Sequence, residues 1–197
     1  MELSEYNGWE NKFTWLVHVH LSSEEHLMQD MTSLVAARSI GYPAGKLVAQ
    51  WVSGVLTNWQ MDVPDSFRAY AGYLRLLVWD VVGSALAYAD WESLVRLLRG
   101  ETVTSDNLFT WSLYGSILNE SHLHQPVGTL MQETPDAYAC ADTLKDWFEA
   151  QITAWIDASE VRRRRNATIS VVVNNLLQSA YEVINWEYVA RAFQPGY

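Results

Sequence analysis

Five histidines are the residues of this chain best suited to hold a metal ion: His18, His20, His26, His122 and His124. His18 and His20 are two positions apart, so on a helix their rings point to different sides, and such a pair is poorly placed to chelate a metal ion. No H-E-x-x-H or C-x-x-C motif supplies further ligands. Packing or capping explains His26 and His122 equally well. We therefore expect no metal site and no cofactor.

Cys140 is the only cysteine, and it lies in the alanine-rich stretch "YACAD". The chain has no G-x-S-x-G elbow and no glycine-rich phosphate loop. A small buried apolar group is the expected role of Cys140. We expect no catalytic residue and no enzyme activity, and one cysteine without a disulfide partner suits a reducing compartment.

Acidic residues gather in one part of the chain. Residues 101–160 contain ten acids and one base, Lys145, and thus almost all of the protein's net charge of -10. A run of four arginines follows. The candidate partner-binding residues are Glu133, Asp136, Asp142, Asp146, Glu149, Asp157, Glu160, Arg162, Arg163, Arg164 and Arg165.

The acidic balance, with a pI near 4.8, argues against direct binding to nucleic acid or to an anionic membrane. The most apolar stretch, 73–91, carries Arg75, Asp80 and Asp90, which makes a membrane span improbable. Asp142, Asp146 and Glu149 fall about 5–6 Å apart along one helix face, comparable to successive phosphates of a duplex. A solvated acidic face followed by a polar loop accounts for the same residues.

The residues above belong to a chain that repeats itself. "NKFTW" (11–15) and "NLFTW" (107–111) lie 96 positions apart, and residues 11–59 share 13 identities with 107–155 at that offset. At an offset of 95, "SALAYADWESLVR" (84–96) matches "SAYEVINWEYVAR" (179–191). The pattern predicts a tandem duplication, with a first repeat at 1–100 and a second repeat at 101–197.

Apolar residues recur at helical spacing almost throughout, and "TISVVV" (168–173) is the one run that could compete as a strand. Asn11, Asn107 and Asp90 are predicted N-caps. The clearest helix is 138–159. We expect an all-α fold of two similar tandem helical units packed with pseudo-twofold symmetry. Trp15, Trp51, Trp59 and Trp91 should then be as buried as Trp111, Trp147, Trp155 and Trp186.

The opening "YNGWENKFTW" (6–15) resembles the start of a family of small uncharacterised proteins from phages, plasmids and bacteria, including cyanobacteria, whose typical beginning is Y-N-G-W-x-N-x-E-T-W. Phe13 departs from the usual Glu. Such proteins end in N-W-x-x-[IV]-A, which "NWEYVA" (185–190) resembles, and the second repeat has "ETVTSD" (101–106) in place of Y-N-G-W. The resemblance implies a helical fold and a mobile-element origin, and it transfers no catalytic residue.

These observations favour a non-enzymatic, phage-type protein in the cytoplasm of a bacterial host. Its expected partner is a protein with a basic surface, such as a CRISPR effector or a restriction enzyme, which it would inhibit by occlusion or by an acidic DNA-mimicking face. An adaptor that presents two equivalent surfaces is the alternative, and homodimer formation stays open. A lesser alternative is an enzyme with His26 or His122 as base in a pocket between the repeats.

Overall fold

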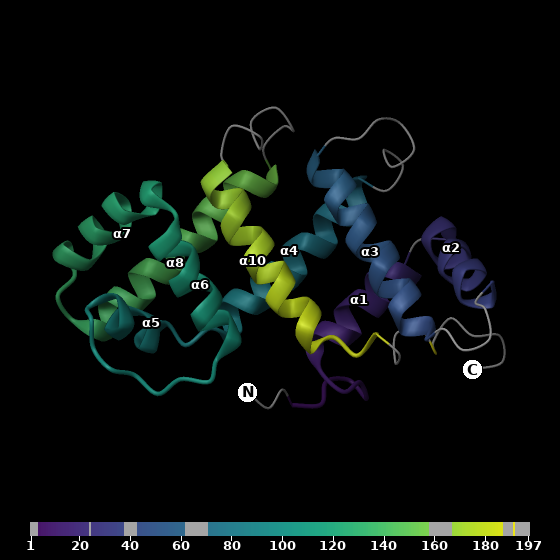
Figure 1. Ribbon diagram of the computed structural model, residues 1–197, viewed down its shortest axis with the longest axis horizontal. Helices are drawn as coiled ribbons and strands as arrows, with labels where there is room; N and C mark the ends of the chain where they lie inside the picture. The colour runs from purple at the N-terminus through teal and green to yellow at the C-terminus, as the bar shows by residue number, and fades with distance from the viewer. Residues whose placement is uncertain are drawn as a thin grey trace. The chain divides into compact units, whose positions relative to one another are not determined.

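The computed structural model describes residues 4–23, 25–37, 43–61, 71–157, 167–186 and 191. Within these ranges the chain forms nine helices and no strand, so the predicted all-α fold is confirmed (Figure 1). The first five are α1 (Lys12–Ser22), α2 (Glu25–Ala36), α3 (Ala44–Met61), α4 (Ala71–Tyr88) and α5 (Trp91–Leu98). The others are α6 (Leu108–Asn119), α7 (Ser121–Glu133), α8 (Ala137–Asp157) and α10 (Ala167–Val183).

The run 168–173, which could compete as a strand, is part of α10. Its β-branched residues are tolerated because burial at helical spacing outweighs their modest helix propensity. Ile169, Val172, Val173 and Leu176 are all buried. The helix predicted at 138–159 is α8, at 137–157.

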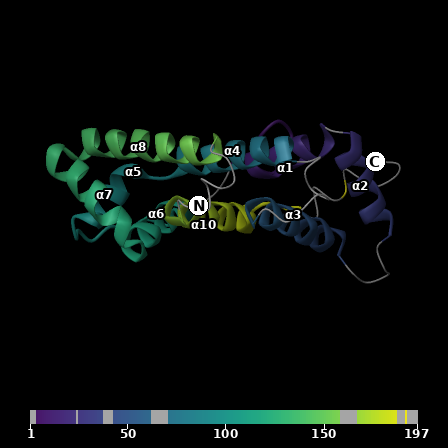
Figure 2. The ribbon, with the colours of Figure 1, turned by 90° about the horizontal axis from the view of Figure 1, so that it is seen from above.

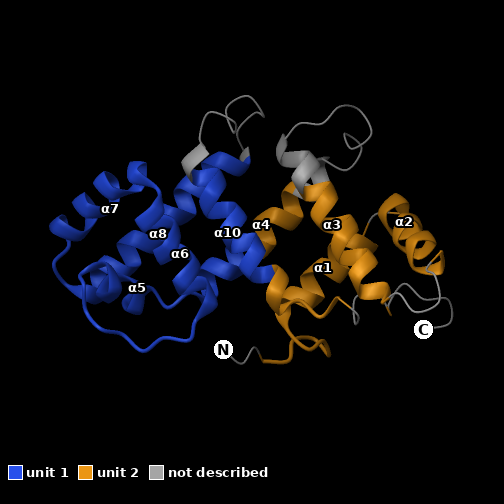
Figure 3. Cartoon of the chain, viewed as in Figure 1, with its two compact units in different colours: residues 1, 82–180 blue, residues 2–81, 181–197 orange. Residues whose placement is uncertain are grey.

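The chain divides into two compact units, which we describe separately (Figure 3). Unit 1 contains residues 82–180, and unit 2 contains residues 2–81 and 181–197. The boundaries fall inside α4, after Val81, and inside α10, after Ala180. The compact units are therefore a different division of the chain from the predicted repeats at 1–100 and 101–197.

Polar side chains cap the helices at three predicted positions. Asn11 Oδ1 accepts a hydrogen bond from the Thr14 amide at 2.9 Å, and Asn107 Oδ1 accepts from the Thr110 amide at 3.0 Å. Asp90 Oδ1 accepts from the Ser93 amide, also at 3.0 Å. Each cap satisfies an amide that the first helical turn leaves without a partner.

In unit 1, α5 packs against α6 and α8, while α7 packs against the same two helices (Figure 2). The Trp91 ring lies 5.9 Å from the ring of Phe148. Cys140 is fully buried on α8, as predicted for a small apolar group. The buried residues of α6, α7 and α8 include Phe109, Leu113, Leu123, Leu144, Phe148 and Ile152.

In unit 2, α2 packs against α1 and α3. The buried residues of these helices include Phe13, Val17, Leu27, Met31, Val48, Val52 and Leu56. Six of these seven lie 96 positions before the six named in unit 1, and Met31 lies 96 before the buried Val127. The same positions of the two similar sequences are therefore core positions.

Four hydrogen bonds form where the end of α4, the start of α5 and the start of α6 meet in unit 1, and we call this set the helix junction. Asn107 Nδ2 donates to the Tyr88 carbonyl at 2.6 Å, while its Oδ1 forms the cap to the Thr110 amide. Thr110 Oγ1 accepts from the Asp90 amide at 2.7 Å, and Trp91 Nε1 donates to the Leu86 carbonyl at 2.9 Å. Backbone groups at the break between α4 and α5 are thereby satisfied by the side chains of Asn107, Thr110 and Trp91.

Unit 2 contains the same junction, bond for bond. Asn11 Nδ2 donates to the Val183 carbonyl at 2.8 Å, and its Oδ1 caps the Thr14 amide. Thr14 Oγ1 accepts from the Asn185 amide at 3.0 Å. Trp186 Nε1 donates to the Tyr181 carbonyl at 3.2 Å. The start of the first repeat is thus joined to the end of the second, whereas unit 1 joins the end of the first to the start of the second.

Candidate functional site

The acidic candidates are exposed on unit 1 wherever the structure describes them. Asp142, Asp146 and Glu149 lie along one face of α8 at intervals of four and three residues, and all three are exposed. They form what we call the acidic stripe. At one helical turn per 3.6 residues, such spacing keeps the carboxylates on one side of the helix. Lys145 Nζ approaches Glu149 Oε1 at 4.0 Å.

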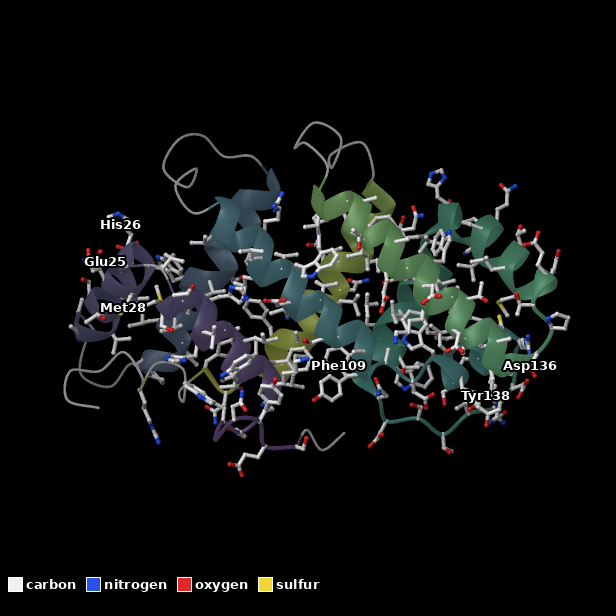
Figure 4. The ribbon with its side chains drawn as sticks, turned by 180° about the vertical axis from the view of Figure 1, so that it is seen from behind. Glu25, His26, Met28, Phe109, Asp136 and Tyr138 are labelled. Carbon is white, nitrogen blue, oxygen red and sulfur yellow. The ribbon has the colours of Figure 1, made fainter. Side chains whose placement is uncertain are left out.

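Two further acidic candidates lie near the N-terminal end of α8. Glu133 is exposed at the last position of α7. Asp136 is also exposed, and its Oδ1 accepts from the Ala139 amide at 2.9 Å, so it caps the first turn of α8 (Figure 4). A carboxylate at this place is stabilised by the positive end of the helix dipole. The side chains of Asp157, Glu160, Arg162, Arg163, Arg164 and Arg165 lie outside the described residues.

The helix at the corresponding place in the first repeat, α3, has a different surface. Lys46, Gln50 and Ser53 occupy the positions that correspond to the acidic stripe, and all three are exposed. The buried residues of the two helices correspond, as described above, but their solvent faces do not. Of these two helices, α8 therefore carries the acidic stripe and α3 does not.

Each unit has a polar contact between a corresponding pair of helices, but the residues that form it differ. In unit 2, His20 Nε2 lies 2.7 Å from Asp80 Oδ2, between α1 and α4. In unit 1, Asn175 Nδ2 donates to Ser116 Oγ at 2.8 Å, between α6 and α10. Ser116 lies 96 positions after His20, and Asn175 lies 95 after Asp80. A histidine–carboxylate contact in one unit thus takes the place of an amide–hydroxyl contact in the other.

A tight turn at residues 6–9, which we call the aromatic turn, lies against α1. Tyr6 and Trp9 exchange two backbone hydrogen bonds of 2.8 Å, and Asn7 and Gly8 have φ values of 50° and 78°. Two central residues with positive φ define a type I′ turn, for which Asn-Gly is the favoured sequence. The Tyr6 ring lies 4.9 Å from the Trp15 ring, and the Trp9 ring stacks on His18 at 4.3 Å.

The equal burial predicted for the tryptophans of the two repeats is wrong at two pairs, Trp15 with Trp111 and Trp91 with Trp186. Trp111 is 42% exposed, whereas Trp15 is half-buried. Trp15 has the aromatic turn beside it, and residues 102–105 of the second repeat contain no aromatic ring. Trp91 and Trp155 are buried, Trp51, Trp147 and Trp186 are half-buried, and the side chain of Trp59 lies outside the described residues.

The histidines do not converge on a metal site in the described part of the chain, where no group of three or more His, Cys, Asp or Glu residues could hold an ion. His26 on α2 and His122 on α7 are exposed. Burial lowers the pKa of His18. At Cys140, burial raises the pKa of the thiol and outweighs the opposing effect of Arg99, so the reactive thiolate is disfavoured.

Comparisons with protein-family models, with curated proteins and with solved structures found no match to this chain. Among the helices that the structure describes, none has the length and hydropathy to cross a lipid bilayer. The surfaces and contacts of the described residues are therefore the basis for a proposed function.

Proposed function

We propose that this protein is a non-enzymatic binding protein that attaches to a basic surface of a partner protein through the acidic stripe of α8. Asp142, Asp146 and Glu149 carry this proposal because they are exposed on one helix face. Charges arranged in this way attract a basic partner over a distance and orient it before contact. Asp136 and Glu133 are two further exposed acids just before the start of α8.

The partner proposed is a nucleic-acid-handling complex of a bacterial host, such as a CRISPR effector or a restriction enzyme. With a rise of 1.5 Å per residue, the carboxylates of the stripe follow one another at about 4.5–6 Å along the helix axis, which suits a channel built to receive phosphates. Occupation of that channel would inhibit the complex. A phage or plasmid origin, as the resemblance of residues 6–15 implies, suits a protein that blocks host defence.

A tandem duplication is part of the same proposal. The helix junction recurs bond for bond at offsets of 96 and 95, which supports a common ancestor for the two repeats. The solvent faces of α3 and α8 have diverged, with Lys46 where α8 has Asp142. Divergence of this kind gives one acidic binding surface, and it weakens the case for an adaptor with two equivalent surfaces.

The test is charge reversal of the stripe in the full chain. The variant Asp142→Lys, Asp146→Lys, Glu149→Lys and the unmodified protein are used as bait in bacterial lysate treated with nuclease. The matched control is Glu5→Lys, Glu25→Lys, Asp30→Lys, which changes the net charge equally at three exposed acids of unit 2. We expect a basic complex to be retained by the unmodified protein and by the control but lost with the stripe variant. Equal retention by all three proteins would refute attachment through α8.

A further inference from the structure

One face of α6 presents aromatic and apolar side chains to solvent, and we call it the α6 aromatic face. Trp111, Tyr114 and Leu118 lie at intervals of three and four residues, which places them on one side of the helix. Trp111 is 42% exposed and Leu118 is 53% exposed. The rings of Trp111 and Tyr114 meet edge to face at 5.7 Å.

The indole of Trp111 is held in one orientation. Its Nε1 donates to the Ser105 carbonyl at 2.7 Å, so the polar edge of the ring is satisfied by its own chain. What remains exposed is therefore the apolar surface of the indole, which gains free energy when another apolar group covers it. A fixed ring also loses little side-chain entropy on binding.

The corresponding face of α1 shows what covers such a surface. Trp15 and His18 occupy the positions that correspond to Trp111 and Tyr114. The aromatic turn lies on them, with Tyr6 against Trp15 and Trp9 against His18. Each ring of the helix thus receives one ring of the turn.

In unit 1, the described residues include no such cover for α6. Residues 102–105, which correspond to the aromatic turn, are Thr, Val, Thr and Ser and bring no ring. Among the described residues, the ring contact made by Trp111 is the one with Tyr114. The α6 aromatic face is thus the counterpart of a surface that the same chain covers elsewhere.

We propose that the α6 aromatic face docks a tight turn of a partner protein in which two aromatic residues flank Asn-Gly. The aromatic turn of unit 2 is the template for this occupant, because its two backbone hydrogen bonds preform the geometry within four residues. A preformed turn loses little conformational entropy when it binds. This surface is distinct from the acidic stripe and extends the proposed function to a second contact.

The charged residues near α1 and α6 indicate which side chains should flank the docked turn. On α1, Lys12 Nζ lies 5.9 Å from the centre of the Tyr6 ring, and acidic Glu5 and Glu10 flank the turn. On α6, the position of Lys12 is taken by Leu108, and in the preceding segment Glu101 pairs with Arg96 at 2.9 Å. Since Leu108 brings no positive charge to this place, a partner turn that carries its own Lys or Arg is favoured.

The experiment titrates the ¹⁵N-labelled full chain with the cyclised peptide Lys-Tyr-Asn-Gly-Trp-Lys and follows backbone amides and indole N–H signals by NMR. We expect saturable shifts at the Trp111 indole and along α6. A peptide with Ala for Tyr and Trp should cause none. The peptide with Glu in place of both Lys residues should bind at least several-fold more weakly, with a difference that shrinks as salt is added.

Two variants of the chain locate the site. Trp111→Ala should abolish the shifts, whereas Trp79→Ala, which removes a tryptophan of similar exposure (41%) from α4, should leave them unchanged. The proposal is overturned if the peptide causes no shift at α6, if the Ala peptide acts equally, or if both variants lose binding. Shifts of the same α6 signals on raising the protein concentration without peptide would assign the surface to a second copy and refute the partner turn.

Discussion

Asn107 makes two hydrogen bonds at the helix junction of unit 1, and its removal should cost a predictable amount of stability. Loss of the cap on the Thr110 amide costs about 1 kcal/mol, within a usual range of about 0.5–2. Loss of the bond to the Tyr88 carbonyl costs about 1 kcal/mol more. Asn107→Ala should therefore lower the free energy of unfolding by about 2 kcal/mol, which reduces the ratio of folded to unfolded protein about 30-fold.

The two contributions can be separated at the same position. Asn107→Ser keeps an oxygen that can cap the helix but cannot reach the Tyr88 carbonyl, so we expect about half the loss, roughly 1 kcal/mol. The matched change in unit 2 is Asn11→Ala, because Asn11 caps Thr14 and donates to the Val183 carbonyl. It should cost the same amount within about 0.5 kcal/mol, because the same two kinds of hydrogen bond are lost. If the junctions are independent, the two costs should add in the double variant.

The assay is urea denaturation followed by helical circular dichroism, with the slope of the transition compared between variants. An unchanged slope shows that a shifted midpoint reports stability rather than altered compactness. A cost below about 0.5 kcal/mol for Asn107→Ala, or an equal cost for Asn107→Ser and Asn107→Ala, would contradict these roles of Asn107.

Two further predictions concern half-buried titratable residues of unit 2, His18 and Tyr181. Burial lowers the pKa of His18 beneath its ordinary value of about 6.5, so the unfolded chain binds a proton more readily than the folded protein. The stability that the neutral ring contributes is therefore fully present above pH 6.5, and it is lost as the pH falls through the folded-state pKa. Unfolding midpoints at pH 7.5 and 5.5 should differ less for His18→Phe than for the unmodified chain, and an identical difference would contradict this. The hydroxyl of Tyr181 is buried and has no hydrogen-bond partner among the described residues, and burial raises its pKa far above the usual range. Tyr181→Phe should leave the free energy of unfolding unchanged or raise it by about 1 kcal/mol, whereas a clear loss in the same urea assay would reveal a partner.

Local features of the fold could be predicted from the sequence because they depend on neighbouring residues. A cap needs a short polar side chain and an amide three positions later, and Asn11, Asn107 and Asp90 meet that condition. The helical spacing of apolar residues likewise predicted α8. Corresponding core positions followed from the similarity of the two repeats.

The contacts between distant residues could not be predicted in this way. Nothing near Asn11 indicates that its amide group reaches the carbonyl of Val183. The exposure of Trp111 was missed for a similar reason, because identical residues were expected to have identical surroundings. What differs is the segment that precedes each helix, and the absence of rings from residues 102–105 was the signal in the sequence that could have revealed it.

The two helix junctions differ in how far the chain must travel to close them. Asn107 and Tyr88 are 19 residues apart, whereas Asn11 and Val183 are 172 apart. Loop-closure entropy grows with the logarithm of length, so the longer closure costs about 2 kcal/mol more from an unfolded chain. Residues 82–180 are continuous in the sequence and can complete unit 1 as they are synthesised. In unit 2, by contrast, Asn11 and Thr14 cannot form their junction bonds to residues 181–186 until those residues have been synthesised. Two junctions with the same hydrogen bonds are therefore expected to form early in one unit and last in the other.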